Sequence, residues 1–268
     1  MNTHRLSRTL RRFAAAFALA LAFASPPAAA QNALDTIVKR GKILVGIDLA
    51  VPPFGMQDEK FQPTGSEVET AQLLAKDLGV ELEIVTVTAA NRIPYLATNR
   101  VDLILATFAI SPERAKSVWF STPYGATGSV LMGPKSVAVK SYADLAGKKV
   151  SVARGSFTEQ SLAREAAGAT IVRFDDDAAA TAAMVAGQVD AYGTAMPIAL
   201  DLIKRFPDKQ YEIKFQMLTA WYSIGMKRGE SDLLQWVNTF LFFRLQNGDL
   251  ARIYQKWIGI PLPPTPTL

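Results

Sequence analysis

Residues 101–114 read VDLILATFAISPER, and this stretch decides the fold class. Its first half, Val101–Ala106, is a short apolar run that is typical of a buried strand. The chain turns polar where that run ends, and Arg114 closes the stretch. Ligands of open α/β sheets bind beyond the carboxyl ends of the strands, so the polar half predicts part of a binding cleft.

The alternation of strands and helices continues on both sides of this stretch. Upstream, the pattern predicts strands at Lys42–Ile47 and Glu81–Val87, and helices at Val68–Leu78 and Arg92–Asn99. Downstream, it predicts strands at Lys149–Ala153, Thr170–Phe174 and Val189–Tyr192, and helices at Phe157–Ala167, Ala178–Ala186, Pro197–Arg205, Leu233–Phe243 and Leu250–Trp257. Such alternation indicates an α/β fold with mostly parallel sheets, and the two series, 42–106 and 149–192, predict two lobes.

The N-terminus has the pattern of a secretory signal peptide, residues 1–30. Four arginines between Arg5 and Arg12 precede an apolar run, Phe13–Phe23, and the small residues Ala28–Ala30 end the segment. The run is shorter than the roughly 20 apolar residues of a membrane span, and no later segment is long enough. We therefore expect cleavage before Gln31, export to the periplasm, and a mature protein that is not embedded in a membrane.

Composition excludes several classes of function. The chain has no cysteine, and its only histidine, His4, lies in the predicted signal peptide, which excludes disulfides, thiol catalysis, a Ser-His-Asp triad and a His-ligated metal. Beyond residue 30, 25 basic residues face 24 acidic ones, so no net charge favours nucleic acid. The acidic run Asp175–Asp177 precedes a helix and indicates helix capping rather than a metal site. We expect neither a metal nor a cofactor.

Several segments together resemble the periplasmic polar-amino-acid-binding proteins of ABC importers, solute-binding family 3. The resemblance spans roughly 36–260 and is carried by Gly41–Phe54, Gly65–Glu69, Val101–Arg114, Phe120–Tyr124, Gly147–Ser156 and Gly248–Trp257. It implies the two-lobed type II periplasmic-binding-protein fold, in which each lobe is a mostly parallel sheet flanked by helices and the ligand lies in the cleft between lobes. It also implies a discontinuous lobe 1, residues 31–126 and 224–268, and a lobe 2 of residues 127–223.

The resemblance assigns a carboxylate site to residues that follow strands. Arg114 matches the arginine that clamps the α-carboxylate of the ligand, for which a planar guanidinium is suited. Ser156, at a helix start, would offer its N–H and hydroxyl to the same carboxylate. Thr107 and Ala109 would offer backbone groups, and Thr107 also its hydroxyl. The alternatives are a surface arginine at position 114 and an ordinary N-cap at position 156.

Three further residues match positions near the ligand in this family. Asp48 often faces the ligand but could equally cap a turn. Phe54 matches a loop aromatic that contacts either the ligand or the core, while the ring that usually stacks on the ligand is replaced here by Val51. Arg92 resembles a residue that contacts the side-chain carboxylate in glutamate- and aspartate-binding members, although the same Asn-Arg-Ile-Pro string occurs in members of other specificity.

One position departs from the family pattern. Members that bind α-amino acids usually carry an aspartate for the α-ammonium group five residues after the aspartate that is Asp190 here, and this chain has Ala195. A buried ammonium group without a carboxylate is costly. Either Asp48, Glu69 or Thr194 takes this role, or the ligand lacks an α-amine.

The predicted function is that of a periplasmic solute-binding component of an ABC importer. We expect a monomer that captures an amino acid or a related small carboxylate by lobe closure and docks on an inner-membrane permease. Arginines without an obvious acidic partner favour an acidic or polar ligand. Two alternatives remain: a dehydratase-like enzyme of the prephenate or arogenate type, with Glu69 or Asp48 as acid or base, and a ligand-sensing subunit that needs a separate receptor. Nothing in the sequence requires catalysis, so we expect no enzyme.

Overall fold

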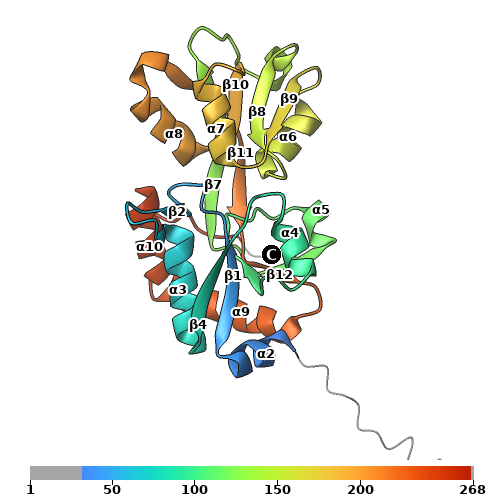
Figure 1. The fold of residues 1–268 in the computed structure, drawn as a ribbon, viewed down its shortest axis with the longest axis vertical. Coiled ribbons are helices and arrows are strands. Elements are labelled where there is room, and N and C mark those ends of the chain that lie inside the picture. Colours follow the sequence, from blue (N-terminus) through green and yellow to red (C-terminus); the bar gives the residue numbers. More distant parts are fainter. Residues whose placement is uncertain (1–31, 267–268) are drawn as a thin grey trace, which may run out of the picture. The chain divides into compact units, whose positions relative to one another are not determined.

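The computed structural model describes residues 32–266, so the predicted signal peptide lies outside the described residues. Residues from Ala33 onward form one structural unit. Within the described range, the strands form two five-stranded sheets and one two-stranded sheet, β2 (Met56–Gln57) with β3 (Pro63–Thr64) (Figure 1). We call the parts built around the two large sheets lobe 1 and lobe 2.

The sheet of lobe 1 combines early segments of the chain with a late one. Its strand order is β4-β1-β5-β12-β6. The bounds are Glu81–Thr86 for β4, Lys42–Ile47 for β1, Leu103–Ile104 for β5, Gly225–Lys227 for β12 and Val118–Phe120 for β6. Because β12 pairs with both β5 and β6, the chain returns to this sheet after building the other one.

The sheet of lobe 2 has the order β11-β7-β10-β8-β9. The bounds are Tyr211–Tyr222 for β11, Gly125–Pro134 for β7, Ala191–Ala195 for β10, Lys149–Ala153 for β8 and Thr170–Phe174 for β9. The long strands β7 and β11 pair along their length, from Gly125 with Tyr222 to Pro134 with Tyr211. Their residues at the Gly125 end contact the core of lobe 1, so this pair joins the two lobes.

Strand directions confirm mostly parallel sheets with one reversed strand in each. In lobe 1, β4, β1 and β5 are parallel, and β12 is antiparallel to both of its neighbours. In lobe 2, β10, β8 and β9 are parallel, and β7 is antiparallel to both of its neighbours. The carboxyl ends of the parallel strands therefore lie at one edge of each sheet, where α/β proteins place ligands.

Helices pack against both sheets. Those around lobe 1 are α2 (Ala33–Arg40), α3 (Ser66–Leu78), α4 (Arg92–Ala97), α5 (Pro112–Ala115), α9 (Ser231–Gln246) and α10 (Asp249–Ile258). Those around lobe 2 are α6 (Phe157–Glu165), α7 (Asp177–Val185), α8 (Met196–Arg205) and the 3₁₀ helices η1 (Tyr142–Leu145) and η2 (Pro207–Lys209). Within the described residues, no helix has both the length and the apolarity that a membrane span requires.

Helix α3 shows how the sequence determines an element. Val68, Ala71, Leu74 and Ala75 are buried on one face, and α3 packs on β1 and β4. The helix ends where Gly79 adopts a left-handed conformation with φ of 72°, which glycine reaches without steric cost. This amphipathic pattern and the glycine stop are the features from which the helix was predicted.

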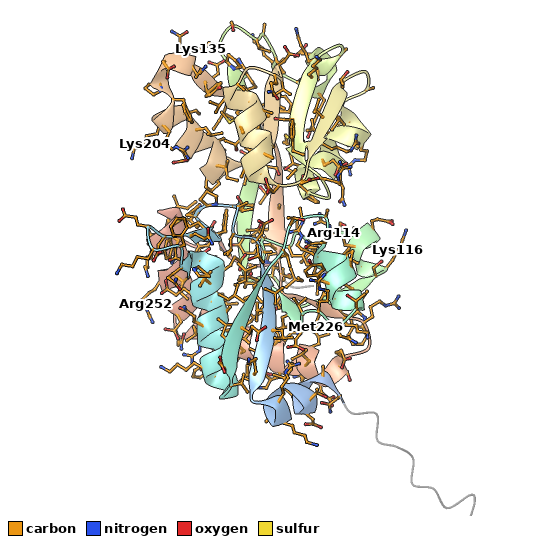
Figure 2. All side chains as sticks on the ribbon, in the orientation of Figure 1. Arg114, Lys116, Lys135, Lys204, Met226 and Arg252 are labelled. Atoms are coloured by element: carbon orange, nitrogen blue, oxygen red, sulfur yellow. The ribbon has the colours of Figure 1, made fainter. Side chains whose placement is uncertain are left out.

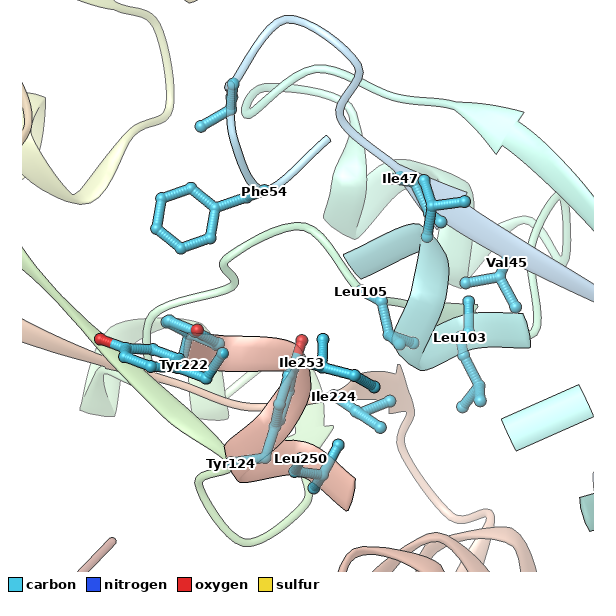
Figure 3. Close-up of a cluster of buried hydrophobic side chains, with 14 of the residues drawn as sticks. Val45, Ile47, Phe54, Leu103, Leu105, Tyr124, Tyr222, Ile224, Leu250 and Ile253 are labelled. Atoms are coloured by element: carbon cyan, nitrogen blue, oxygen red, sulfur yellow. The ribbon is translucent and has the colours of Figure 1, made fainter. Parts of the chain in front are cut away.

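The core beneath the cleft is shown in Figure 3. Phe54 and Tyr124 both make edge-to-face contacts with Tyr222, at ring-centroid distances of 5.9 and 5.0 Å. Val45 and Leu103 belong to the same buried cluster and come from neighbouring strands of lobe 1. Since Tyr222 is the last residue of β11, this cluster ties the strand pair that joins the lobes to the core of lobe 1.

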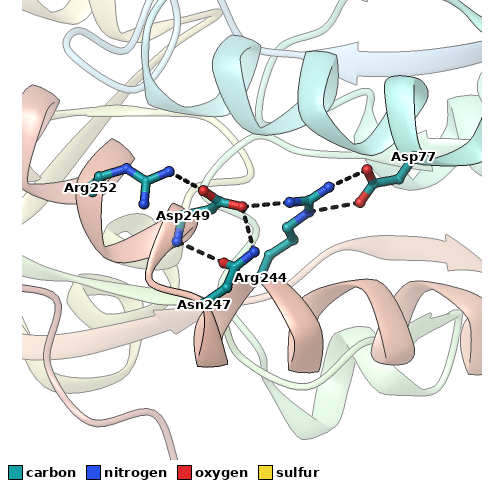
Figure 4. Close-up of polar contacts among 5 residues, drawn as sticks. All are labelled: Asp77, Arg244, Asn247, Asp249 and Arg252. Carbon is teal, nitrogen blue, oxygen red and sulfur yellow. Dashed lines mark hydrogen bonds and ion pairs between the residues drawn. The ribbon is translucent and has the colours of Figure 1, made fainter.

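An ion-pair network holds the last two helices in place. Arg244 of α9 lies between Asp77 of α3 and Asp249 of α10, with its Nε 2.8 Å from Asp77 Oδ2 and its Nη1 2.6 Å from Asp249 Oδ2 (Figure 4). Arg252 and Asn247 also contact Asp249. One guanidinium therefore links the last two helices, α9 and α10, to α3, which lies far from them in sequence.

Candidate functional site

A cavity of about 70 Å³ lies between the two lobes, at the carboxyl ends of their strands. Seven of the eight predicted binding residues line it: Asp48, Arg92, Thr107, Ala109, Arg114, Ser156 and Thr194. Asp48 directly follows β1, and Thr194 lies at the end of β10. The residues that the strand-end rule singled out in both lobes therefore meet at one cavity.

A larger surface groove, of about 540 Å³, lies between α3 and α10. Four of its charged side chains are paired: Glu69 accepts from Lys256, and also from Trp257, at 2.7 Å, and Arg252 contacts Asp249, while Lys76 is exposed. Glu69 is therefore a surface acid. It does not line the cavity between the lobes, where the sequence left open a role for it as ammonium acceptor. The groove contributes no buried charge without a partner, and the smaller cavity between the lobes is the better candidate site.

Arg114 is a buried cation whose described hydrogen-bond acceptors are carbonyl oxygens. Its guanidinium donates to Ala109 O at 2.7 Å and, across the cleft, to Gly155 O at 2.9 Å. Only 4% of the residue is exposed, and no described carboxylate lies within 4.0 Å. Burial and the neighbouring Arg92 lower the pKa of Arg114 to about 9. Figure 2 shows it in the part of lobe 1 that faces lobe 2.

The local sequence positions Arg114 for this contact. Ser111 caps the short helix α5 by accepting from the Arg114 N–H at 3.3 Å, and Pro112 occupies the first turn. On the other side of the cleft, Gly155 has φ of 75° and lies against Ala90. A Cβ at position 155 would lie 2.9 Å from Ala90 Cα, so glycine permits the lobes to approach closely here.

Arg92 and Asp48 form a second charged feature within lobe 1. Arg92 donates to Ala106 O at 2.8 Å and to Ala89 O at 3.2 Å, and its guanidinium lies 4.8 Å from the centre of the Phe108 ring. Burial lowers the pKa of Arg92, and Asp48 is the carboxylate that opposes this most strongly. Burial raises the pKa of Asp48 to about 6, against the Ala50 N–H and Arg92.

Some of the groups that were predicted to bind the carboxylate already form hydrogen bonds within the protein. Ser156 is the N-cap of α6: its Oγ accepts from Glu159 N at 3.0 Å, and its own N–H donates to Ala153 O at 3.2 Å. The hydroxyl hydrogen of Ser156 is then the group left to offer. Ala109 pairs with Tyr222 without exchanging hydrogen bonds, so its N–H is turned away from the partner strand.

Glu67 holds the backbone of Thr107, which lines the cavity, and the sequence analysis missed this role. It is 1% exposed and accepts from Thr107 N at 2.8 Å and from the Tyr124 hydroxyl. Thr107 has a left-handed φ of 45°, which a residue with a Cβ rarely adopts without support. Burial raises the pKa of Glu67 to about 7. Its position four residues before Ala71 on the apolar face of α3 could have indicated that it is buried.

Asp177 is a second functional candidate that the sequence analysis missed. Within the acidic run, Asp176 is the N-cap and accepts from Ala179 N at 2.7 Å, as capping predicted. Asp177 instead lines the cavity, where its Oδ1 accepts from Tyr192 at 2.6 Å and Thr194 at 3.3 Å. Burial raises the pKa of Asp177, while these hydroxyls and Arg92 oppose the shift.

Phe54 requires a correction to the predicted site. It does not line the cavity, it is 1% exposed, and its ring packs against Tyr222 in the core of lobe 1. The Phe54 ring lies in the buried apolar cluster and not at the strand ends. Val51 and Phe157 are apolar residues that do line the cavity, together with Thr127, whose buried hydroxyl has no hydrogen-bond partner among the described residues.

The cavity therefore offers two guanidiniums, two carboxylates and several hydroxyls around a small volume. Such an arrangement can hold a small polar solute with charged groups of both signs. Within residues 32–266, no group of three or more metal-ligating side chains is present.

Comparison with known proteins relates this geometry to a family. Residues 43–260 match the bacterial extracellular solute-binding proteins, family 3. The L-cystine-binding protein TcyJ of Escherichia coli strain K12 is 32% identical over 231 residues, which cover 85% of this chain and 87% of that protein. The glutamine-binding protein GlnH of an ABC transporter in Bacillus subtilis strain 168 is also 32% identical, over 85% of each chain.

A solved structure gives the same result for the fold. An ancestral arginine-binding protein bound to arginine superposes with a TM-score of 0.78 at 34% identity, over 82% of this chain and 99% of that one. The names of these three similar proteins give cystine, glutamine and arginine as their solutes. The side chains of these solutes differ in charge, and the α-amino and α-carboxylate groups are common to all three.

Proposed function

Because the chain belongs to the bacterial extracellular solute-binding proteins, family 3, we propose that it captures an α-amino acid between its lobes and delivers it to an ABC importer. As a member of this family it is a solute-binding protein rather than an enzyme. The relatives support the solute class, and their different ligands leave the amino-acid side chain open.

The single observation that carries the proposal is the buried Arg114 without a carboxylate partner. A buried guanidinium is costly unless an anion compensates it, and three of its five N–H donors have no described acceptor. The α-carboxylate of an amino acid supplies two acceptor oxygens in the planar geometry that a guanidinium matches. The Ser156 hydroxyl, the Thr107 hydroxyl and the Ala109 N–H line the same cavity and would complete the carboxylate site.

The cavity favours a ligand without net charge over a dicarboxylate. The sequence leaned towards an acidic ligand because its arginines lacked an obvious acidic partner. Asp48 and Asp177 line the cavity together with Arg92 and Arg114, so two carboxylates face two guanidiniums. A zwitterionic amino acid keeps this balance, whereas a dicarboxylate would add an uncompensated negative charge.

Closure of the lobes provides the mechanism of capture. The proposed lobes, residues 31–126 with 224–268 and residues 127–223, are joined by β7 and β11. A ligand that contacts Arg114 on one side and Ser156 on the other binds the closed form better than the open one, and this difference in affinity drives closure. We further propose a periplasmic monomer, released by cleavage before Gln31, that presents its closed form to an inner-membrane permease.

A ligand screen tests the proposed function. The full chain is expressed, and the protein is purified from the periplasm, stripped of ligand by unfolding and refolding, and heated with L-cystine, L-glutamine, L-arginine, L-glutamate or glutarate. A ligand at 100 times its dissociation constant adds about 2.7 kcal/mol to the stability of the folded state. Stabilisation by at least one α-amino acid, and none by glutarate, is the expected result. No stabilisation by any of the four amino acids would overturn the proposal.

A further inference from the structure

We propose that Asp177 receives the α-ammonium group of the ligand, in place of the aspartate that this chain lacks at Ala195. This inference rests on the proposed amino-acid-binding function and names the group in lobe 2 that recognises the amine. Ala195 ends β10, and Asp177 begins the helix α7 that packs against β10. The carboxylate has thus moved from a strand end to the start of the neighbouring helix, while both positions line the same cavity.

Two hydroxyl groups hold the Asp177 carboxylate in place. Tyr192 and Thr194 are alternate residues of β10, and both donate to the same oxygen, Oδ1, at 2.6 and 3.3 Å. The second oxygen, Oδ2, has no described hydrogen-bond partner. Neutral hydroxyls orient a carboxylate without cancelling its charge. The cation that acts on Asp177 is Arg92, which interacts more strongly with Asp48, so the Asp177 charge is only partly compensated.

Four charged groups line the cavity, and among the described residues none of them forms an ion pair within 4.0 Å. Asp48 and Arg92 both belong to lobe 1, and each is the strongest oppositely charged neighbour of the other. Asp177 of lobe 2 and Arg114 of lobe 1 remain, a negative and a positive group on opposite sides of the cleft. An α-amino acid carries the complementary carboxylate and ammonium groups, so one ligand satisfies both and links the lobes.

The other candidates for the amine are already engaged. The Asp48 carboxylate accepts from Ala50 N at 3.1 Å and has Arg92 as its counter-charge. Glu69 lies on the surface with Lys256 and Trp257. Thr194 donates its hydroxyl hydrogen to Asp177, which makes it a positioning residue for that carboxylate.

The test compares amino acids with analogues that lack only the α-amine. The pairs are L-glutamine with glutaramic acid, L-arginine with δ-guanidinovaleric acid, and L-cystine with dithiodipropionic acid. Dissociation constants are measured by calorimetry for the natural protein, for Asp177→Asn and for Asp175→Asn. The amide oxygen that Asp177→Asn introduces still accepts from Tyr192 and Thr194 but carries no charge. Asp175 is an exposed acid of the same run that does not line the cavity.

The expected result is a selective loss for the amine-bearing ligands. In Asp177→Asn, affinity for the amino acid falls ~30-fold or more, the usual cost of removing one partner of a buried charge pair. Affinity for the amine-free analogue changes little. Asp175→Asn leaves both constants unchanged. Asp177→Ser, a residue well suited to a first helical turn, is the second variant should Asp177→Asn fail to fold.

The outcomes separate this inference from the proposed function. If the natural protein binds one of these amino acids and both Asp177 variants bind it equally well, the amine site is wrong while the proposed function stands. An equal loss for the amino acid and its analogue would also overturn the inference, because it would indicate a general distortion of the cavity. L-glutamate with its amine-free analogue glutarate forms a fourth pair, and if the natural protein binds none of the four amino acids, both proposals fail together.

Discussion

Arg244 and Arg114 place the same side chain in opposite electrostatic environments. Arg244 lies between two carboxylates, Asp77 and Asp249, with 18% of its side chain exposed. Arg114 is more deeply buried, yet its described acceptors are the carbonyl oxygens of Ala109 and Gly155. The first arginine finds its counter-charges within the chain and holds three helices together. The second has no described carboxylate within 4.0 Å, as the proposed carboxylate site requires.

The comparison also separates stability from function. A guanidinium that is compensated within the fold contributes to the free energy of unfolding, and its loss leaves carboxylates unpaired. A buried guanidinium without a carboxylate costs stability in the free protein, and that cost is recovered when an anion binds. Variants at the two kinds of position should therefore affect different measurements.

The largest expected effect is on ligand affinity at Arg114. Arg114→Met keeps most of the side-chain volume and removes the charge, so affinity for the bound amino acid should fall on the order of 1,000-fold, about 4 kcal/mol. The free energy of unfolding without ligand should stay the same or rise, because an uncompensated buried charge is gone. Calorimetry and denaturant unfolding measure the two quantities. Unchanged affinity in a folded variant would refute the carboxylate assignment.

Arg92 should behave as the counter-charge of Asp48 despite lining the cavity. Arg92→Met leaves Asp48 buried without its counter-charge, and we expect a loss of ~3 kcal/mol of stability at pH 8. The double variant Arg92→Met, Asp48→Asn should recover much of this loss, since the stranded charge is removed as well. Additive losses in the double variant would show that the two groups are not coupled.

The same Arg92 variant tests the specificity suggested by the sequence. If Arg92 selects dicarboxylates, its loss weakens acidic ligands alone. If it serves as the partner of Asp48, L-glutamate and L-glutamine lose affinity by similar factors.

Glu67 extends the comparison to a buried acid that forms no ion pair within 4.0 Å among the described residues. Its pKa is raised to about 7 by burial, above the ordinary value of 4.5. A raised pKa means that the folded state binds the proton more tightly than the unfolded state does. The stability that this proton provides is present below pH 4.5 and is lost as the pH rises through 7, on the order of 3 kcal/mol.

The Glu67→Gln variant isolates this contribution. We expect a smaller fall in unfolding free energy between pH 4.5 and 7 than in the natural protein, measured by denaturant titration at several pH values. Some slope should remain, because Asp48 and Asp177 also have raised pKa values and act with the same sign. Identical slopes in the two proteins would mean that Glu67 keeps its charge throughout.

The sequence predicted most of the fold because its local patterns agree with the tertiary structure. Strands β1, β8 and β9 have the predicted bounds, and α3 ends at the predicted glycine. The strand predicted at Val101–Ala106 shortens to Leu103–Ile104, since its ladder partners cover only Val45 and Gly46 on one side and Gly225 and Met226 on the other. Of the flanking residues, Val101, Leu105 and Ala106 are buried, and the N–H groups of Asp102 and Leu105 donate to β1 outside the assigned strand.

The long strand pair β7 and β11 was not predicted. Its burial does not alternate, because one end joins the core of lobe 1 and the other belongs to lobe 2. The partners are also distant in sequence, Gly125 with Tyr222, and no local pattern reports such a pairing. The strand β12 was missed for a similar reason, as a short segment that returns to a distant sheet.

The cavity-lining residues that follow strands were among those predicted, and the buried acids that lie on helices were not. Asp48, Thr107 and Ser156 follow strands, and all three line the cavity. Asp177 and Glu67 lie in the first turns of their helices, where acids normally complement the helix dipole. That general rule gave no reason to expect either side chain inside the protein. Periodicity could have placed Glu67 inside, but only the packing of α7 on β10 brings Asp177 beside Tyr192 and Thr194.

The smallest expected effect is on the free energy of unfolding at Arg244, the arginine that lies between two carboxylates. Arg244→Met removes a guanidinium that bridges Asp77 and Asp249 near the surface, and we expect a loss of ~1–2 kcal/mol of stability with no change in ligand affinity. Arg252→Met is the matched control: it contacts Asp249 alone and is 71% exposed, so its loss should be at most ~0.5 kcal/mol. A large fall in affinity in Arg244→Met would mean that the closing helices influence the cleft, and the separation of structural and binding arginines would then fail.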